Sequence, residues 1–101
     1  MLYESTRVLL RDILLSLERA DSVRWEDEVE SAGECSYAMH QMARPLYQGY
    51  RIDPTNQTRV GAPLCERAAR AIPHVKLMVR AIRRKDRKAA VESGEAALAE
   101  M

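Results

Sequence analysis

The chain has 101 residues, of which 47% are hydrophobic, and a formal net charge of +1 at pH 7. This length suits one core and excludes two independent ones, so we expect a single helical domain over residues 1–101. The near-neutral charge argues against a general polyanion binder, and the lack of Phe predicts a thin aliphatic core, which favours homodimerisation.

The first predicted helix begins at Ser5 or Thr6 and ends at Ala20. Its aliphatic residues recur at helical spacing and form one core face, made of Leu9, Leu10, Ile13, Leu14 and Leu17. With Leu10 as reference, Val8 and Leu15 fall about 160° and 140° away, on the opposite side of the helix. Aliphatic side chains flanked by charges on an outward face indicate a contact, either with another helix of the chain or with a partner.

A second helix is predicted after an N-cap at Asp21-Ser22, and it ends or kinks near Pro45. The acidic residues of its first turns suit the positive end of the helix dipole. The expected buried stripe, with Cys35 and Met42 at its edge, is Trp25, Val29, Ala32, Ser36, Met39 and Ala43. Tyr37 lies about 120° from this stripe, so we expect it to be exposed and a candidate anchor for a partner.

Residues 49–61 form the longest irregular segment, in which Asp53-Pro54 predicts a short helical turn. Ala62-Pro63 then predicts the start of a third helix. Its buried positions keep a regular heptad spacing across Pro73: Leu64, Ala68, Ala71, Val75, Met78 and Ile82. We therefore expect one kinked helix here and not two separate helices.

A fourth, alanine-rich helix is predicted from a cap at Asp86 to about Glu100. Its apolar face is weak and Gly94 interrupts it, so its end is expected to fray. The sequence leaves open whether the third and fourth helices are continuous. The predicted fold is a small all-α bundle of three to four helices, as a homodimer.

The two halves of the chain differ in charge. Residues 1–43 carry four basic and nine acidic side chains, whereas residues 44–91 carry twelve basic and three acidic ones. If the third and fourth helices are continuous, one ridge of the combined helix carries Lys76, Arg80, Arg83 and Arg87. Three explanations of this ridge are open. It is a solvent-exposed face or a partner of the acidic second helix, a binding surface for an acidic protein, or a binding surface for nucleic acid.

No catalytic, metal-binding or cofactor-binding pattern is found in the sequence. His40 and His74 lack the Glu-x-x-His spacing of helical di-metal sites, and Cys35 and Cys65 are interpreted as free thiols of a cytoplasmic protein. Charged residues interrupt the apolar N-terminal stretch, so we predict neither a signal sequence nor a membrane span.

These features favour a non-enzymatic protein that binds a partner protein and changes its activity, as an anti-activator, adaptor or chaperone does. Val8, Leu15 and Tyr37 are the predicted partner-binding residues, and the basic ridge supplies the charged contacts. The alternative is a nucleic-acid-binding regulator that uses the basic ridge. A third hypothesis is an enzyme whose site is assembled only by the fold.

Overall fold

The computed structural model describes residues 2–19, 21–44, 49, 51–52, 55–56 and 59–101. Most of them belong to four α-helices, α1 (Leu2–Arg19), α2 (Trp25–Met42), α3 (Leu64–Arg83) and α4 (Arg87–Glu100). Two strands of two residues each, β1 (Arg51–Ile52) and β2 (Arg59–Val60), are the remaining described elements. The helical class that the periodicity predicts is confirmed.

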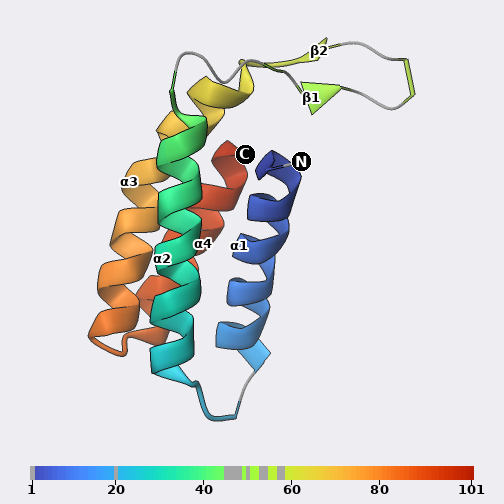
Figure 1. Cartoon of the computed structure of the whole chain (residues 1–101). Coiled ribbons are helices and arrows are strands. Elements are labelled where there is room, and N and C mark those ends of the chain that lie inside the picture. The colour runs from blue at the N-terminus through green and yellow to red at the C-terminus, as the bar shows by residue number, and fades with distance from the viewer. Residues whose placement is uncertain (1, 20, 45–48, 50, 53–54, 57–58) are drawn as a thin grey trace.

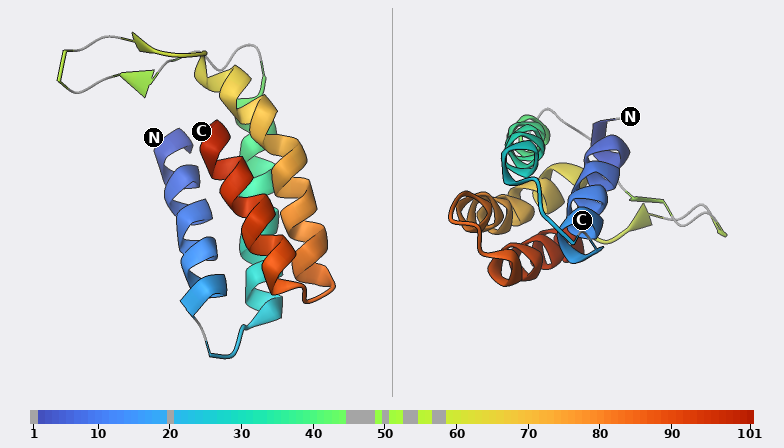
Figure 2. Two further views of the ribbon diagram at one scale, coloured as in Figure 1. Left: turned by 180° about the vertical axis from the view of Figure 1, so that it is seen from behind. Right: turned by 90° about the horizontal axis from the view of Figure 1, so that it is seen from below.

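The four helices run alternately up and down, so that helices adjacent in sequence lie antiparallel (Figure 1). Both α1 and α3 pack against α2 and α4, which places α1 across from α3 (Figure 2). The two ends of the chain lie near each other, at the end of the molecule that carries the strands (Figures 1 and 2). Among the described residues, each helix is too short or too polar to span a lipid bilayer.

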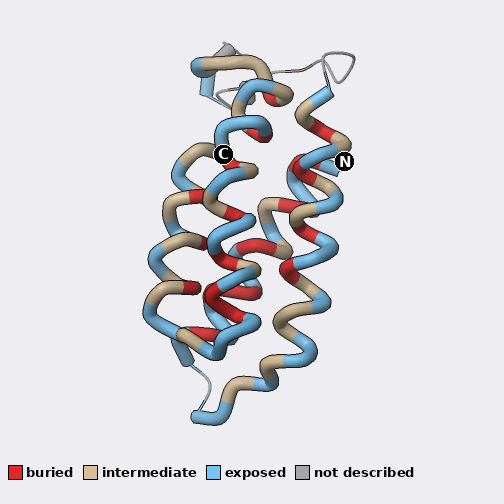
Figure 3. Tube along the Cα trace, turned by 90° about the vertical axis from the view of Figure 1, so that its left-hand side faces the viewer, coloured by how far each residue is buried: buried red, intermediate tan, exposed pale blue. Residues whose placement is uncertain are grey.

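Buried residues lie on the inner sides of the helices, where they form one aliphatic core (Figure 3). All six heptad positions predicted for the third helix are buried in α3. Four of the five predicted core residues of the first helix are buried in α1 and Leu9 is half-buried. The hydrophobic periodicity therefore located the core of these two helices correctly.

The start of α1 differs from its predicted position, because the helix begins at Leu2 and not at Ser5 or Thr6. Tyr3 is buried, and its hydroxyl donates a hydrogen bond to the backbone carbonyl of Met101. The Thr6 hydroxyl donates to the Leu2 carbonyl oxygen at 2.7 Å, within the first turns of the helix. These tertiary and local bonds order an extra turn that the aliphatic spacing does not reveal.

The predicted cap of the second helix is wrong, because α2 starts at Trp25 after Arg24 and has no side-chain cap. The predicted stripe is also rotated from the observed one. Cys35 and Met42, expected at the edge, are fully buried, whereas Ser36 is only half-buried. The reason is that α2 packs against both α1 and α3. Its buried face is therefore centred between the predicted stripe and the flanking row of Cys35 and Met42.

Pro73 lies inside α3, which continues through it as one helix, and the first turns of α3 are inclined to the later ones (Figure 2). The third and fourth helices are separate, because the chain turns at Lys85, whose φ is 59°. Asp86 then caps α4 as predicted, and its side chain accepts a hydrogen bond from the Ala89 amide at 3.1 Å. The sequence left open whether these two helices are continuous, and the structure shows two antiparallel helices.

The fraying expected at the end of the fourth helix is wrong. Gly94 is buried, and a Cβ there would lie 2.5 Å from Leu14 Cδ2 and 3.0 Å from Met78 Sδ. Its missing side chain lets α4 approach α1 and α3 closely. Beyond it Ala97 and Met101 are buried, so the last turns of α4 are packed into the core.

The segment between α2 and α3 contains an antiparallel strand pair, in which Arg51 pairs with Val60 and Ile52 with Arg59. This pair extends away from the helices, on the side of α1 (Figures 1 and 2). The predicted helical turn at Asp53-Pro54 and the predicted helix break at Pro45 lie outside the described residues. Paired strands in a segment expected to be irregular were not foreseen from the sequence.

Candidate functional site

A groove runs along the surface between α2 and α3 and encloses about 250 Å³. We call it the basic groove, and it is lined by Gly33, Ser36, Lys76, Val79, Arg80 and Arg83. Two of these residues come from α2 and four from α3. The groove therefore brings together three of the four cations that the sequence predicts as a ridge.

The cations of the groove all come from one wall, on α3. The heptad stripe turns one face of α3 into the core, which leaves the positions between stripe residues on its shoulders. Lys76, Arg80 and Arg83 occupy the shoulder nearest α2, at spacings of four and three residues, and all three are exposed. They therefore form a continuous row of positive charge along one edge of the groove.

The predicted ridge is wrong in its fourth member. Arg87 is the first residue of α4, beyond the turn at Lys85, and it does not line the groove. The ridge requires a continuous helix through residues 83–87, and the positive φ of Lys85 ends that helix. The structure therefore reduces the basic row to the three cations of α3.

The opposite side of the groove is formed by small residues of α2. A Cβ added to Gly33 would meet no atom within 4 Å, so the groove is open above the α2 backbone. One turn further along, the carbonyl oxygen of Ser36 accepts a hydrogen bond from Nδ1 of His40 at 2.8 Å. Val79 of α3 is half-buried and contributes apolar surface between these small residues and the cations.

Lys76, Arg80 and Arg83 form no ion pair with the described residues of the acidic second helix. The ion pairs within the described part of the chain are all local: Arg24 with Asp27, Arg70 with Glu66, and Arg84 with Asp86. None of them joins α2 to α3, although the two helices are neighbours. One explanation for the ridge is attraction between these two helices. No ion pair among the described residues supports it.

The predicted partner-binding residues fall on two different sides of the molecule. Tyr37 directly follows Ser36 on α2, and 69% of its surface is exposed, as predicted. Val8 and Leu15 are 50% and 37% exposed on α1, which also confirms their outward position. Because α1 lies across from α3, Tyr37 belongs beside the basic groove while Val8 and Leu15 form a separate surface.

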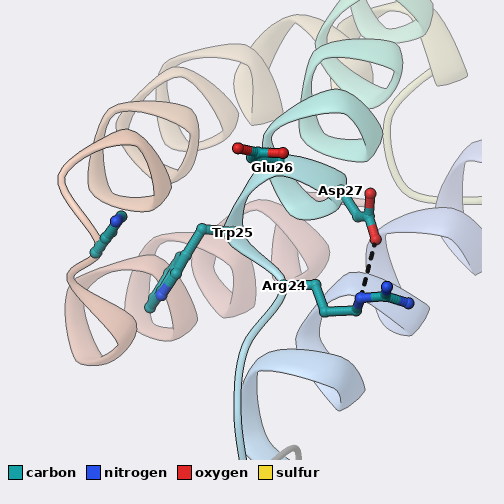
Figure 4. A pocket seen from close by; sticks show the side chains of 5 residues that line it. Arg24, Trp25, Glu26 and Asp27 are labelled. Atoms are coloured by element: carbon teal, nitrogen blue, oxygen red, sulfur yellow. Dashed lines mark ion pairs between the residues drawn. The ribbon is translucent and has the colours of Figure 1, made fainter.

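A second hollow, of about 410 Å³, lies where the start of α2 meets the turn between α3 and α4 (Figure 4). Arg24, Trp25, Glu26, Asp27 and Lys85 line it, and Trp25 extends toward that turn. Trp25 was expected in the core but is only half-buried. The charges here include both signs, and Arg24 pairs with Asp27 at 3.5 Å, so this hollow has no uncompensated row like that of the groove.

The titratable residues of the described chain form no group of three or more His, Cys, Asp or Glu side chains placed to hold a metal ion. Both cysteines are free, as predicted. Burial raises the pKa of the Cys35 thiol to about 12, so this thiol stays protonated and unreactive at neutral pH. Cys35 is therefore a core residue of α2 and not a nucleophile.

The spacing of charged residues in the sequence predicts the cations of the groove but not its other wall. Gly33 gave a weak signal, since a glycine inside a helix is unfavourable unless packing or access requires it. No protein-family model, curated protein or solved structure matches this chain.

Proposed function

We propose that this chain is a non-enzymatic interaction protein that docks a charged helix of a partner protein in the basic groove. One observation carries the proposal. The exposed side chains of Lys76, Arg80 and Arg83 line one wall of an open hollow, and no ion pair of the described residues neutralises them. Such a row suits acidic groups that come from outside the chain.

The spacing of the cations specifies the kind of partner. Positions separated by four and three residues lie on one side of a helix, so the row extends about 10 Å along α3. A partner helix with acidic residues at the same spacing matches all three cations when it lies along the groove. Its small apolar side chains fit over Gly33 and Val79, which supplies the desolvated contact that exposed charge pairs lack.

Exposed acidic residues of α2 near the groove favour a protein over a nucleic acid as this partner. Glu30 and Glu34 are exposed on α2, and Glu30 lies one turn before Gly33. A nucleic-acid backbone is negative along its whole length and is repelled by these carboxylates. A protein helix can present acidic residues to α3 and basic residues to α2, and Tyr37 beside the groove adds an amphipathic contact.

Docking in the groove covers a charged helix of the partner and so changes what that partner can bind. This is the action of an anti-activator, adaptor or chaperone. We further propose that the four helices act as one bundle, that the chain works as a homodimer in the cytoplasm, and that Val8 and Leu15 on α1 form the dimer contact. The exposed aliphatic side chains of α1 and the two free thiols support these parts of the proposal.

The proposal is tested with a fluorescent peptide of about 20 residues, designed as a helix with Glu at the spacing of the cation row and Lys on the adjacent face. Fluorescence anisotropy should show saturable binding to the wild type that weakens with salt. The double variant Arg80→Glu with Arg83→Glu should bind at least about tenfold more weakly. Gly33→Leu, which fills the hollow while favouring the helix, should also block binding.

Arg87→Glu is the matched control, since it reverses a nearby exposed charge outside the groove. It should leave the peptide affinity almost unchanged. Equal losses for Arg83→Glu and Arg87→Glu would mean that only net charge matters, which would refute the groove as the site. Tighter binding to duplex DNA than to the peptide near 150 mM salt would favour the nucleic-acid alternative instead.

A further inference from the structure

The outer side of α1 carries a surface that is independent of the basic groove. We call it the α1 stripe, and its exposed residues are Glu4, Val8, Arg11, Asp12, Leu15 and Arg19. At 100° per residue, all six fall within an arc of about 100° that faces away from Leu10. Two aliphatic side chains thus lie in the middle of a narrow band of alternating charge.

The order of residues in the α1 stripe has an internal symmetry. Read along α1, its charges are negative, positive, negative and positive, so the reversed order carries the opposite sign at each position. The midpoint between Arg11 and Asp12 is also the midpoint between Val8 and Leu15, and the midpoint between Glu4 and Arg19. A stripe of this kind is complementary to itself when two copies run antiparallel.

We propose that the α1 stripe binds a second copy of this chain, with the two α1 helices antiparallel about a two-fold axis that passes between Arg11 and Asp12. In this arrangement Val8 of each copy packs against Leu15 of the other. Glu4 of each copy lies at the same height as Arg19 of the other, so the two ends of the stripe meet the opposite charge. A parallel arrangement places Glu4 against Glu4 and Arg19 against Arg19, and these like-charge contacts disfavour it.

Charge complementarity identifies the occupant as a second copy and not an unrelated helix. None of the ion pairs in the described part of the chain uses Glu4, Arg11, Asp12 or Arg19, so their charges are available to a partner. The stripe as a whole is neutral, which suits a surface that must meet itself. The inference gives a geometry to the homodimer of the proposed function, and it leaves both basic grooves open.

Disulfide trapping tests this geometry in a Cys65→Ser background, where the remaining Cys35 is buried. Val8 and Leu15 are seven residues apart, or about 10 Å along the helix. In the antiparallel pair, the Val8 residues of the two copies are offset by this same distance, which is too far for a disulfide. We therefore expect an equimolar mixture of Val8→Cys and Leu15→Cys chains to form a cross-linked dimer within the mixture. Val8→Cys alone should cross-link at least about tenfold more slowly, whereas Arg11→Cys alone, close to the axis, should cross-link readily.

A faster cross-link for Val8→Cys alone than for the mixture would overturn the antiparallel geometry. A wild-type protein that stays monomeric by sedimentation at 100 μM, or a dimer in which none of these cysteines cross-links, would overturn the α1 stripe as the interface. In each of these cases the charged peptide should still bind the basic groove. Failure of the dimer is therefore distinguishable from failure of the proposed function.

A charge exchange tests the register without cysteines. Glu4→Arg alone should raise the dimer dissociation constant about tenfold, because it creates a like-charge pair at both ends of the interface. The double variant Glu4→Arg with Arg19→Glu should restore the wild-type value, since each pair is attractive again. Two single effects that add in the double variant would contradict the pairing of these residues.

Discussion

Helix α3 has a closed side and an open side, and a glycine of a neighbouring helix marks each. At Gly94 of α4 an added Cβ would collide with Leu14 and Met78, so the glycine allows close packing. At Gly33 of α2 an added Cβ would meet open space, although the glycine carries the same conformational penalty of about 1 kcal/mol. Packing explains the first glycine, whereas no packing contact explains the second.

The largest contrast should come from truncating two adjacent residues of α3. Met78 is fully buried on the closed side, so Met78→Ala should lower the free energy of unfolding by about 2 to 5 kcal/mol. Val79 is half-buried in the groove, and Val79→Ala should cost less than about 1 kcal/mol. Urea titration measures both values, and similar losses would show that the two sides of α3 are equally packed.

A smaller effect, of opposite sign at the two positions, is expected from replacing each glycine by alanine. Gly94→Ala should destabilise the fold by about 1 to 3 kcal/mol, because the new methyl group overpacks the contact with Leu14. Gly33→Ala should stabilise it by up to about 1 kcal/mol through helix propensity alone. Thermal unfolding of the two variants gives the comparison, and stabilisation by both would contradict the close contact at Gly94.

The smallest effect concerns Glu28, on the side of α2 that meets α1 and away from the groove. Burial, with a smaller contribution from the charge of Asp27, raises the pKa of Glu28 above its ordinary value. The folded state therefore binds this proton more tightly than the unfolded state, and stability decreases as the pH rises through the folded pKa. Because Glu28 is partly exposed, Glu28→Gln should stabilise the protein at pH 7 by well under about 1 kcal/mol.

The gain from Glu28→Gln should shrink as the pH falls through the raised pKa of Glu28, because the wild-type carboxyl then becomes protonated too. Melting temperatures of wild type and variant at pH 7 and pH 5 measure this difference. Glu30→Gln, at an exposed position of the same helix, is the control. A gain of the same size at both pH values would show that the carboxylate charge is not the cause.

Sequence periodicity predicted the strongly amphipathic elements of this chain. The heptad spacing of α3 identified all six of its expected core positions, and Asp86 was identified as the cap of α4. The stripe of α2 was misplaced because its periodicity does not show how a helix divides its apolar surface between two neighbours. The buried end of α4 was missed because Gly94 indicates a weak helix until its contacts with other helices are known.

The candidate site was predicted only in part, for a similar reason. Spacing along one helix placed Lys76, Arg80 and Arg83 in a row, and the structure places them together. The turn at Lys85, which removes Arg87 from that row, depends on a single backbone conformation that nothing in the local pattern requires. The α2 wall of the groove depends on how two helices pack, which the sequence of either helix does not contain.

The most direct test of the basic groove is a two-dimensional ¹H–¹⁵N NMR titration of the wild-type protein with the charged peptide. We expect the largest shifts at the backbone amides of Gly33, Ser36 and Val79, with little change at Val8 and Leu15 on α1. These shifts should disappear in the double variant Arg80→Glu with Arg83→Glu. Saturable shifts centred on α1 or on the hollow beside Trp25, with the groove amides unmoved, would contradict the account.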